Sequence, residues 1–285
     1  MKKILCLVDF SPASEEAALL GAHLAHQTGG LLTLLHVVHL PLVDTSETAL
    51  MAGELLAEQK QDAEKKLGES CDRIKIRRAK GGQEVDSMTV NCLVQEALLT
   101  DAVEQMTSGE GYELVLMGKT GTGSSLEEML VGSNTQAMIH QVKCPLLALP
   151  EGAARLPIRK IIYATDYDAR DMAGISEVLK VADLFGAQVE AVHIAEAPSE
   201  QAPAFARRLQ EAFPARAVGF TEYPSTQEEE GLQAFLRERG GDMVAMLKKE
   251  AGFFSYLFRR SLTDQMAYHT QVPLLVVQGR EPIPG

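Results

Sequence analysis

Residues 2–39 read KKILCLVDFSPASEEAALLGAHLAHQTGGLLTLLHVVH, and residues 159–196 read RKIIYATDYDARDMAGISEVLKVADLFGAQVEAVHIAE. The two segments align without a gap at an offset of 157 residues. Identical residues at this offset include Asp9 with Asp166, Gly29 with Gly186 and His36 with His193. A match over this length indicates an internal repeat rather than two similar motifs.

The repeat continues toward the end of each half. Two more pairs of segments match: YELVLMGKTG (112–121) with GDMVAMLKKE (241–250), and GSNTQAMIHQVKCPLLAL (132–149) with RSLTDQMAYHTQVPLLVV (260–277). The sequence therefore predicts two copies of one domain, at residues 1–150 and 158–280. The Gly-, Ala- and Pro-rich stretch 150–157 has the composition of a short linker between them.

Each copy alternates between strand and helix patterns. The apolar run 4–8 stops at Asp9 and predicts a buried strand. Ser11 and Pro12 then fit the N-cap and first position of a helix that ends at Gly29. Further strands are expected at 31–38, 88–94, 114–117 and 146–149, and further helices at 47–80, 96–106 and 126–141. This order predicts a parallel sheet with helices on both faces and a ligand site at the carboxyl ends of its strands.

Composition excludes several functions. The chain has 285 residues and a formal net charge of −12, which repels nucleic acid and anionic lipid at long range. It has no Trp and only 5% aromatic residues, so a stacking platform for single strands is not expected. No apolar run is long enough to span a bilayer or serve as a signal peptide. We therefore expect a cytoplasmic protein with no membrane or nucleic-acid partner, whose four cysteines are buried free thiols.

A glycine-rich loop follows the expected strand 114–117. It reads MGKTGTGSSLEEMLVGSNT (117–135) and could present backbone amides to an anion. It is not a Walker A loop, because Glu113 stands where the first glycine is needed. Nor is it a dinucleotide fingerprint, because Leu126 replaces the third glycine. From these residues alone, phosphate binding and a plain connecting loop remain equally open.

Several motifs together resemble the universal stress protein family. They are Gly118-x2-Gly121, Gly132-Ser133 after ten further residues, the segment KCPLLALP (143–150), the strand LCLVDFS (5–11) and the strand LLHVVH (34–39). The resemblance implies two tandem α/β domains, each with five parallel strands in the order 3-2-1-4-5 flanked by helices. This is the Rossmann-like fold of the adenine-nucleotide alpha hydrolase type. It also implies adenine-nucleotide binding where the glycines are kept.

The resemblance assigns roles to individual residues. Asp9 would face the adenine, Val37 would contact the base or ribose through its backbone, and Met117 and Gly118 would lie beside the ribose. Thr120 would add a hydroxyl donor, and the triphosphate would be cradled by Gly121, Gly132, Ser133 and Asn134. Two departures stand out. The spacing is ten rather than nine, so Gly123 competes with Gly121. Phe10 also replaces a glycine of many members, and would either narrow the base pocket or turn to solvent.

The second copy has lost the glycine motif. Leu247 and Glu250 stand in place of the two leading glycines, and Arg260 stands in place of Gly132. A Cβ blocks the close backbone approach and a carboxylate repels phosphate. The basic residues there, including Lys248 and neighbouring Lys and Arg side chains, predict a solvated patch in preference to an anion site. The aromatic cluster 253–258 predicts core or interface in preference to a ligand site.

These features predict a stress-response or signalling protein. The first domain would bind ATP, ADP or AMP, with or without Mg²⁺, and the second would be its structural or regulatory partner. The resemblance also implies that strands 146–149 and 274–277 meet within one chain as an intramolecular pseudo-dimer, because the family's usual dimer places the two final strands side by side; a homodimer is left open. A slow ATPase and a nucleotide-free interaction scaffold are the alternatives. No catalytic or metal-binding residue is assigned, and a non-enzyme is favoured.

Overall fold

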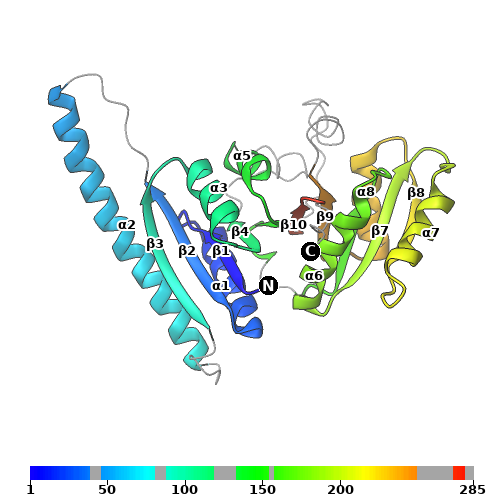
Figure 1. Ribbon diagram of the computed structural model, residues 1–285, viewed down its shortest axis with the longest axis horizontal. Helices are drawn as coiled ribbons and strands as arrows, with labels where there is room; N and C mark the ends of the chain where they lie inside the picture. The colour runs from blue at the N-terminus through cyan, green and yellow to red at the C-terminus, as the bar shows by residue number, and fades with distance from the viewer. Residues whose placement is uncertain (39–45, 81–87, 119–132, 154–156, 249–271, 280–285) are drawn as a thin grey trace. The chain divides into compact units, whose positions relative to one another are not determined.

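The computed structural model describes residues 1–38, 46–80, 88–118, 133–153, 157–248 and 272–279 (Figure 1). The chain divides into two compact units. One contains Met1–Thr120 and Gln141–Cys144, and the other contains Gly121–His140 and Pro145–Gly285. Within the described residues of both units, strands and helices alternate as the sequence predicts.

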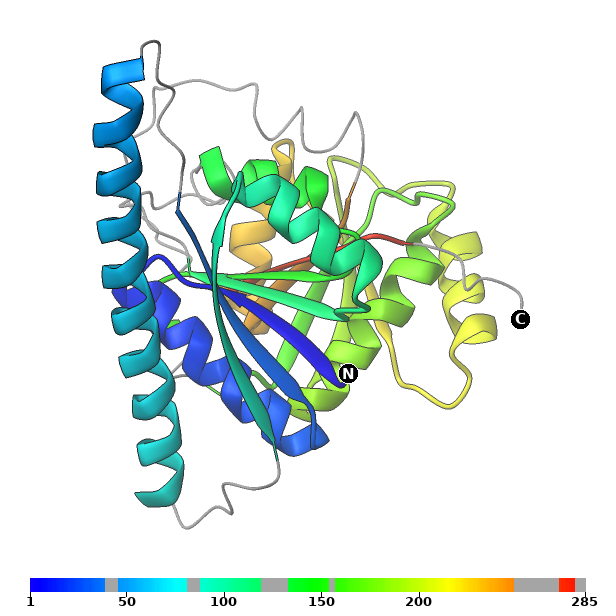
Figure 2. The same ribbon diagram turned by 60° about the vertical axis from the view of Figure 1, so that its left-hand side comes forward.

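The first unit is built on a parallel sheet whose strands run in the order β3-β2-β1-β4. The strands are β1 (Lys3–Leu7), β2 (Leu31–Val38), β3 (Thr89–Glu96) and β4 (Leu114–Gly118). The helices are α1 (Pro12–Thr28), α2 (Ser46–Lys80) and α3 (Leu99–Gly109). Helices α1 and α2 cover one face of this sheet and α3 covers the other (Figure 2). This arrangement is expected because the strand order moves outward from β1 to β3 and then returns to β4 on the other side of β1.

The ends of α1 follow the predicted capping chemistry. Ser11 is the N-cap, and its Oγ accepts a hydrogen bond from the backbone N of Ser14 at 3.2 Å. Pro12 lies in the first turn, where a backbone N–H would have no acceptor within the helix, so the lack of an N–H on proline costs no hydrogen bond. Gly29 ends the helix in the left-handed conformation with φ of 59°. These local signals fix where the chain leaves β1 and returns to β2.

Several boundaries in the first unit differ from the prediction. The expected helix 96–106 begins only at Leu99, because β3 continues through Glu96. The register explains the difference: Val38, the last residue of β2, pairs with Glu96, so the strand persists as long as its partner does. At β4 the strand likewise runs one residue further than expected and includes Gly118.

The second unit repeats the design. Its parallel strands run in the order β8-β7-β6-β9-β10, which is the order 3-2-1-4-5 predicted for a repeat. The strands are β6 (Lys160–Ala164), β7 (Gln188–Ala195), β8 (Gly219–Pro224), β9 (Met243–Leu247) and β10 (Leu274–Val277). The helices are α6 (Asp171–Phe185), α7 (Ala202–Ala212) and α8 (Glu228–Arg239).

The last strand of the first repeat, β5 (Leu146–Leu149), belongs to the second unit. It pairs antiparallel with β10, with Leu147 opposite Leu275. The predicted pairing of the two final strands is therefore confirmed. The sequence had suggested a purely parallel sheet. This one antiparallel pair means that the strands of the second unit are not all parallel. The preceding helix, α5 (Ser133–Gln141), leads into this strand.

Both units have strongly apolar centres. The central strands β1, β4, β6 and β9 are buried along almost their whole length, as expected of parallel strands covered on both faces. The edge strands β3 and β8 carry many partly exposed side chains. None of the helices in the described ranges is both long enough and apolar enough to cross a membrane.

Candidate functional site

A polar turn closes the carboxyl end of β1. The Asp9 carboxylate accepts hydrogen bonds from the backbone N of Ser11 at 3.0 Å and from its Oγ at 2.5 Å. Ser14, which is buried, donates its hydroxyl to the Ser11 carbonyl at 3.0 Å. Partial burial opposes ionisation of Asp9, but the hydrogen bonds from Ser11 and Ser14 lower its pKa below the ordinary value. Asp9 is therefore an anion that orders the entrance to α1.

Phe10 adopts a backbone conformation that glycine would adopt more easily. Its φ is 63°, in the left-handed region, where a Cβ costs about 1 kcal/mol. The ring stacks on His36 with centroids 4.5 Å apart, and it packs against Val38 and the α2 residues Leu56 and Ala63. Phe10 therefore turns toward β2 and α2 rather than out to solvent. His36 is fixed in turn, because its Nδ1 lies 2.7 Å from the Val8 carbonyl oxygen.

The left-handed φ at Phe10 leads to a measurable prediction. Phe10→Ala is expected to lower the free energy of unfolding by about 1 kcal/mol more than Phe10→Gly, because both lose the ring but only glycine relieves the backbone strain. Denaturant unfolding followed by circular dichroism measures both changes. Tyr167 in the second repeat has φ of 64°, so the same pair of substitutions there should give the same order. An alanine variant at least as stable as the glycine variant at both positions would contradict the strain argument.

The end of β4 lies against the beginning of α1. Met117 and Gly118 are buried, and the backbone of Gly118 touches the backbone at Ala13 and Ser14. A Cβ on Gly118 would lie 2.6 Å from the Cα of Ser14. Glycine at this position therefore lets the ends of β1 and β4 and the positive end of α1 meet at one place.

The remaining predicted site residues are only partly visible. Val37 is a half-buried residue near the end of β2. Ser133 and Asn134 form the first turn of α5. The loop residues Thr120, Gly121, Gly123 and Gly132 lie outside the described residues. The structure thus brings Asp9 and Gly118 toward the same end of α1, and the phosphate-loop assignments remain predictions.

The second repeat has a closely similar turn. Tyr167 takes the place of Phe10, and its ring stacks on His193 with centroids 4.2 Å apart. The Nδ1 of His193 lies 2.8 Å from the Thr165 carbonyl oxygen, as His36 does from Val8. Tyr167 also packs edge-on against Phe205 and donates its hydroxyl to Glu222 at 2.8 Å. In both repeats the ring of this histidine is therefore held by a backbone carbonyl oxygen of the neighbouring strand end.

Two substitutions separate the repeats at this point. Leu247, at the end of β9, replaces the glycine that closes β4. Asp171 replaces Ser14 and is buried, accepting hydrogen bonds from the hydroxyls of Tyr163 at 2.7 Å and Thr165 at 2.5 Å. A cavity beside the ends of β6 and β7 has a volume of about 10 Å³, which is room for a single water. That cavity is far too small for a nucleotide.

Sequence reasoning missed the two polar residues at the starts of α1 and α6. Ser14 and Asp171 fall opposite each other at the repeat offset of 157, so the alignment alone marks a position that changes from hydroxyl to carboxylate. Their burial was not visible from the sequence. Among the described residues, no group of three or more His, Cys, Asp or Glu side chains could hold a metal ion.

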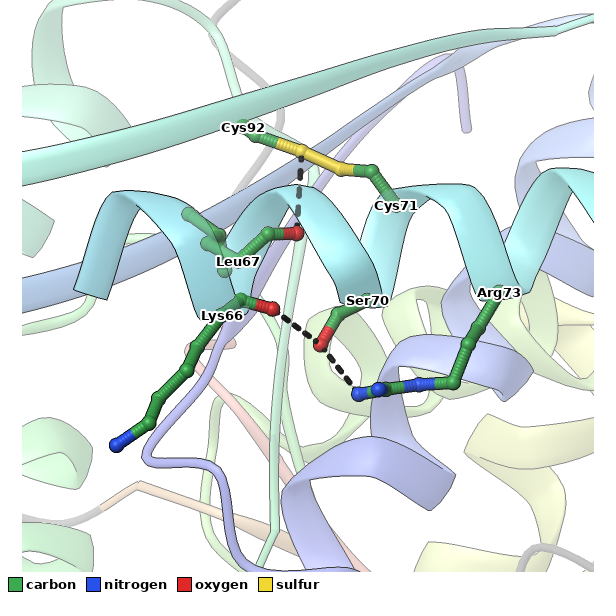
Figure 3. Close-up of a disulfide and its surroundings, with 6 residues drawn as sticks. All are labelled: Lys66, Leu67, Ser70, Cys71, Arg73 and Cys92. Atoms are coloured by element: carbon green, nitrogen blue, oxygen red, sulfur yellow. Dashed lines mark hydrogen bonds between the residues drawn. A yellow bond between two sulfur atoms is a disulfide. The ribbon is translucent and has the colours of Figure 1, made fainter. Parts of the chain in front are cut away.

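The interpretation of all four cysteines as free thiols was wrong for two of them. Cys6 and Cys144 are buried and do not take part in a disulfide. Cys71 on α2 and Cys92 on β3 are joined by a disulfide (Figure 3). The two residues are 21 apart in sequence, and the packing of α2 on the edge strand brings them together. Neither residue type nor spacing signalled this contact.

The fold and the β1 turn define a class of Rossmann-like α/β proteins built from two repeats. Residues 1–150 match the model of the universal stress protein family. The chain therefore belongs to the universal stress protein family. None of the curated protein sequences matches the chain significantly.

Solved structures with a similar fold include proteins of the same length. A universal stress protein from Archaeoglobus fulgidus is 16% identical with a TM-score of 0.63, and the match covers 96% of this chain and 95% of that one. A functionally unknown protein from Pseudomonas aeruginosa is 14% identical with a TM-score of 0.54, over 98% and 92%. A universal stress family protein from Arabidopsis thaliana, solved with AMP bound, is 12% identical with a TM-score of 0.35, over 55% and 96%. The first two likenesses show a shared fold over nearly the whole chain.

Proposed function

We propose that this chain binds an adenine nucleotide, ATP or its relatives ADP and AMP, through the repeat at residues 1–150, and acts in a stress response. The observation that carries the proposal is the junction of the Asp9 turn, Gly118 and the start of α1. The carboxyl ends of parallel strands are where such sheets bind ligands, and this junction lies at the ends of β1 and β4. Membership of the universal stress protein family supports the same assignment.

The glycine loop would supply the phosphate contacts. By the sequence motif, Gly121, Gly123 and Gly132 would leave backbone amides open to the phosphates, and Thr120, Ser133 and Asn134 would add donors. Asp9 and Val37 would lie at the base end, with Met117 and Gly118 beside the ribose. Mg²⁺ would be optional, since no carboxylate is assigned to the phosphate end.

The second repeat, residues 158–280, would act as a partner rather than a second site. Leu247 adds a side chain where Gly118 has none, and Asp171 adds a buried carboxylate near the start of α6. Glu250 also stands where the first repeat has Gly121, and a carboxylate at the phosphate end repels a bound phosphate. One nucleotide for each chain is the resulting expectation.

Calorimetric titration with ATP, together with native mass spectrometry of the purified protein, tests the proposal. Wild type is expected to bind one ATP for each chain. Asp9→Ala and Gly121→Glu, the latter copying Glu250 of the second repeat, should each weaken binding about tenfold or more. The matched control Asp166→Ala should leave the affinity unchanged.

Other outcomes would redirect the assignment. Two bound nucleotides, or loss of binding in Asp166→Ala alone, would contradict the division between the repeats. No retained nucleotide and no thermal shift with millimolar ATP would support the interaction scaffold instead. Steady release of phosphate from ATP with Mg²⁺ would show the slow ATPase.

A further inference from the structure

Residues 60–71 of α2 and the edge strand β3 face each other along matched positions. Residues of β3 with even numbers point toward α2 because side chains alternate along a strand. Glu96 forms an ion pair with Lys60, with the Lys60 Nζ 2.7 Å from the Glu96 Oε1. Val94 packs against the apolar cluster that contains Ala63, and Cys92 is joined to Cys71 by the disulfide. The disulfide thus lies in line with the other contacts between these two elements.

The buried face of α2 positions Cys71 independently of the bond. Its buried apolar residues recur at helical spacing: Leu56, Ala63, Leu67, Cys71 and Ile74. This stripe holds the helix against the sheet whether or not the sulfurs are joined. Cys71 is 5% exposed, so its sulfur is kept on the side that meets β3.

Cys92 is accessible, which sets this pair apart from the other two cysteines. It is exposed on a strand at the edge of the sheet, whereas Cys6 and Cys144 are buried. Its sulfur lies 3.8 Å from the Leu67 carbonyl oxygen, which can accept a hydrogen bond from the thiol when the bond is open (Figure 3). Exposed disulfides are the ones that exchange readily with small thiols.

We propose that Cys71 and Cys92 form a reversible thiol–disulfide couple that fastens α2 to the edge strand β3 under oxidising conditions. The proposal goes beyond nucleotide binding and does not depend on it. Because the buried stripe holds α2 on the sheet in both states, the bond changes how often α2 opens locally and not whether it is docked.

The oxidant is a low-molecular-weight disulfide such as oxidised glutathione. The Cys92 thiolate attacks one of its sulfurs, forming a mixed disulfide and releasing one glutathione. The Cys71 thiolate then attacks the Cys92 sulfur, forming the protein disulfide and releasing the second glutathione. Two electrons pass from the cysteine pair to oxidised glutathione, and the two thiol protons end on the two glutathione molecules. Reduced glutathione reverses both steps.

Thiol counting and hydrogen exchange on the full chain test the proposal. Reagent titration in denaturant should find four thiols after reduction and two after treatment with oxidised glutathione, with Cys71 and Cys92 linked in the peptide map. Backbone amides of α2 around Leu67 and Ile74 should exchange about tenfold more slowly in the oxidised form. Reduced glutathione should restore both starting values.

Single variants separate the couple from general oxidation. Cys71→Ser and Cys92→Ser should abolish the change in α2 exchange, whereas Cys144→Ser should retain it. If a variant misfolds, the thiol counts and the α2 exchange rates of the reduced and oxidised wild type decide whether the couple exists. Four thiols persisting after oxidation, a bond that reduced glutathione does not open, or equal α2 exchange in the two forms would each overturn the proposal.

Discussion

Gly118→Ala is expected to lower the free energy of unfolding by about 2–4 kcal/mol. The added Cβ would lie 2.6 Å from the Cα of Ser14 and closer still to the Ser14 nitrogen and the Ala13 carbonyl carbon. All of these are backbone atoms, so no side-chain rotation relieves the overlap. The start of α1 must move away from β4, and the hydrogen bonds among Asp9, Ser11 and Ser14 are disturbed with it.

A second glycine provides the matched control. Gly68, in the interior of α2, has no atom within 4 Å of the position its Cβ would take. Gly68→Ala should therefore raise the free energy of unfolding by about 0.5–1 kcal/mol, the usual gain of alanine over glycine in a helix. Denaturant unfolding followed by circular dichroism measures both variants. Similar effects of the two substitutions would refute the steric argument for Gly118.

Asp171→Ala should lower the free energy of unfolding by about 3 kcal/mol. The carboxylate is 1% exposed and accepts hydrogen bonds from Tyr163 and Thr165, both of which are also buried. Alanine leaves those two hydroxyls without this acceptor. Asp183→Ala is the control: Asp183 pairs with Arg216 at the surface with its side chain 59% exposed, and its loss should cost less than about 1 kcal/mol.

The same network predicts how stability responds to alkaline pH. Burial, followed by the charge of Asp171, raises the pKa of Tyr163 well above its ordinary value. The folded chain then holds a proton that the unfolded chain releases, so stability should fall as the pH rises above about 10. Tyr163→Phe should reduce this alkaline loss. A fall of the same steepness in that variant would show that Tyr163 is not its source.

Much of the fold followed from the repeat and its local signals. Ser11, Pro12 and Gly29 placed the ends of α1 because capping is a local effect, decided within one turn of helix. The alternation of apolar strands with helices predicted the parallel sheet, and the resemblance to the universal stress protein family implied the pairing of β5 with β10. Boundaries that depend on a partner strand, such as the end of β3, were missed.

The candidate site was predicted less completely. Asp9 and Gly118 were identified from motifs, but the reason for a glycine at 118 appears only when α1 packs on β4. The left-handed backbone of Phe10 was hidden, because the sequence shows an aromatic residue where glycine would signal a positive φ. Asp171 was overlooked, since a carboxylate at a helix start usually serves the helix dipole rather than a buried network.

The sequence by itself determined that this chain is a doubled α/β domain of the universal stress protein family and that only its first copy keeps the glycine motif. These properties follow from the periodicity of apolar residues and from the alignment of the first half of the sequence with the second. Tertiary structure alone decided that Cys71 meets Cys92, that Phe10 stacks on His36 and that Gly118 touches α1. The physical reason is that such contacts join residues distant along the chain, and packing of helix on sheet sets their distances.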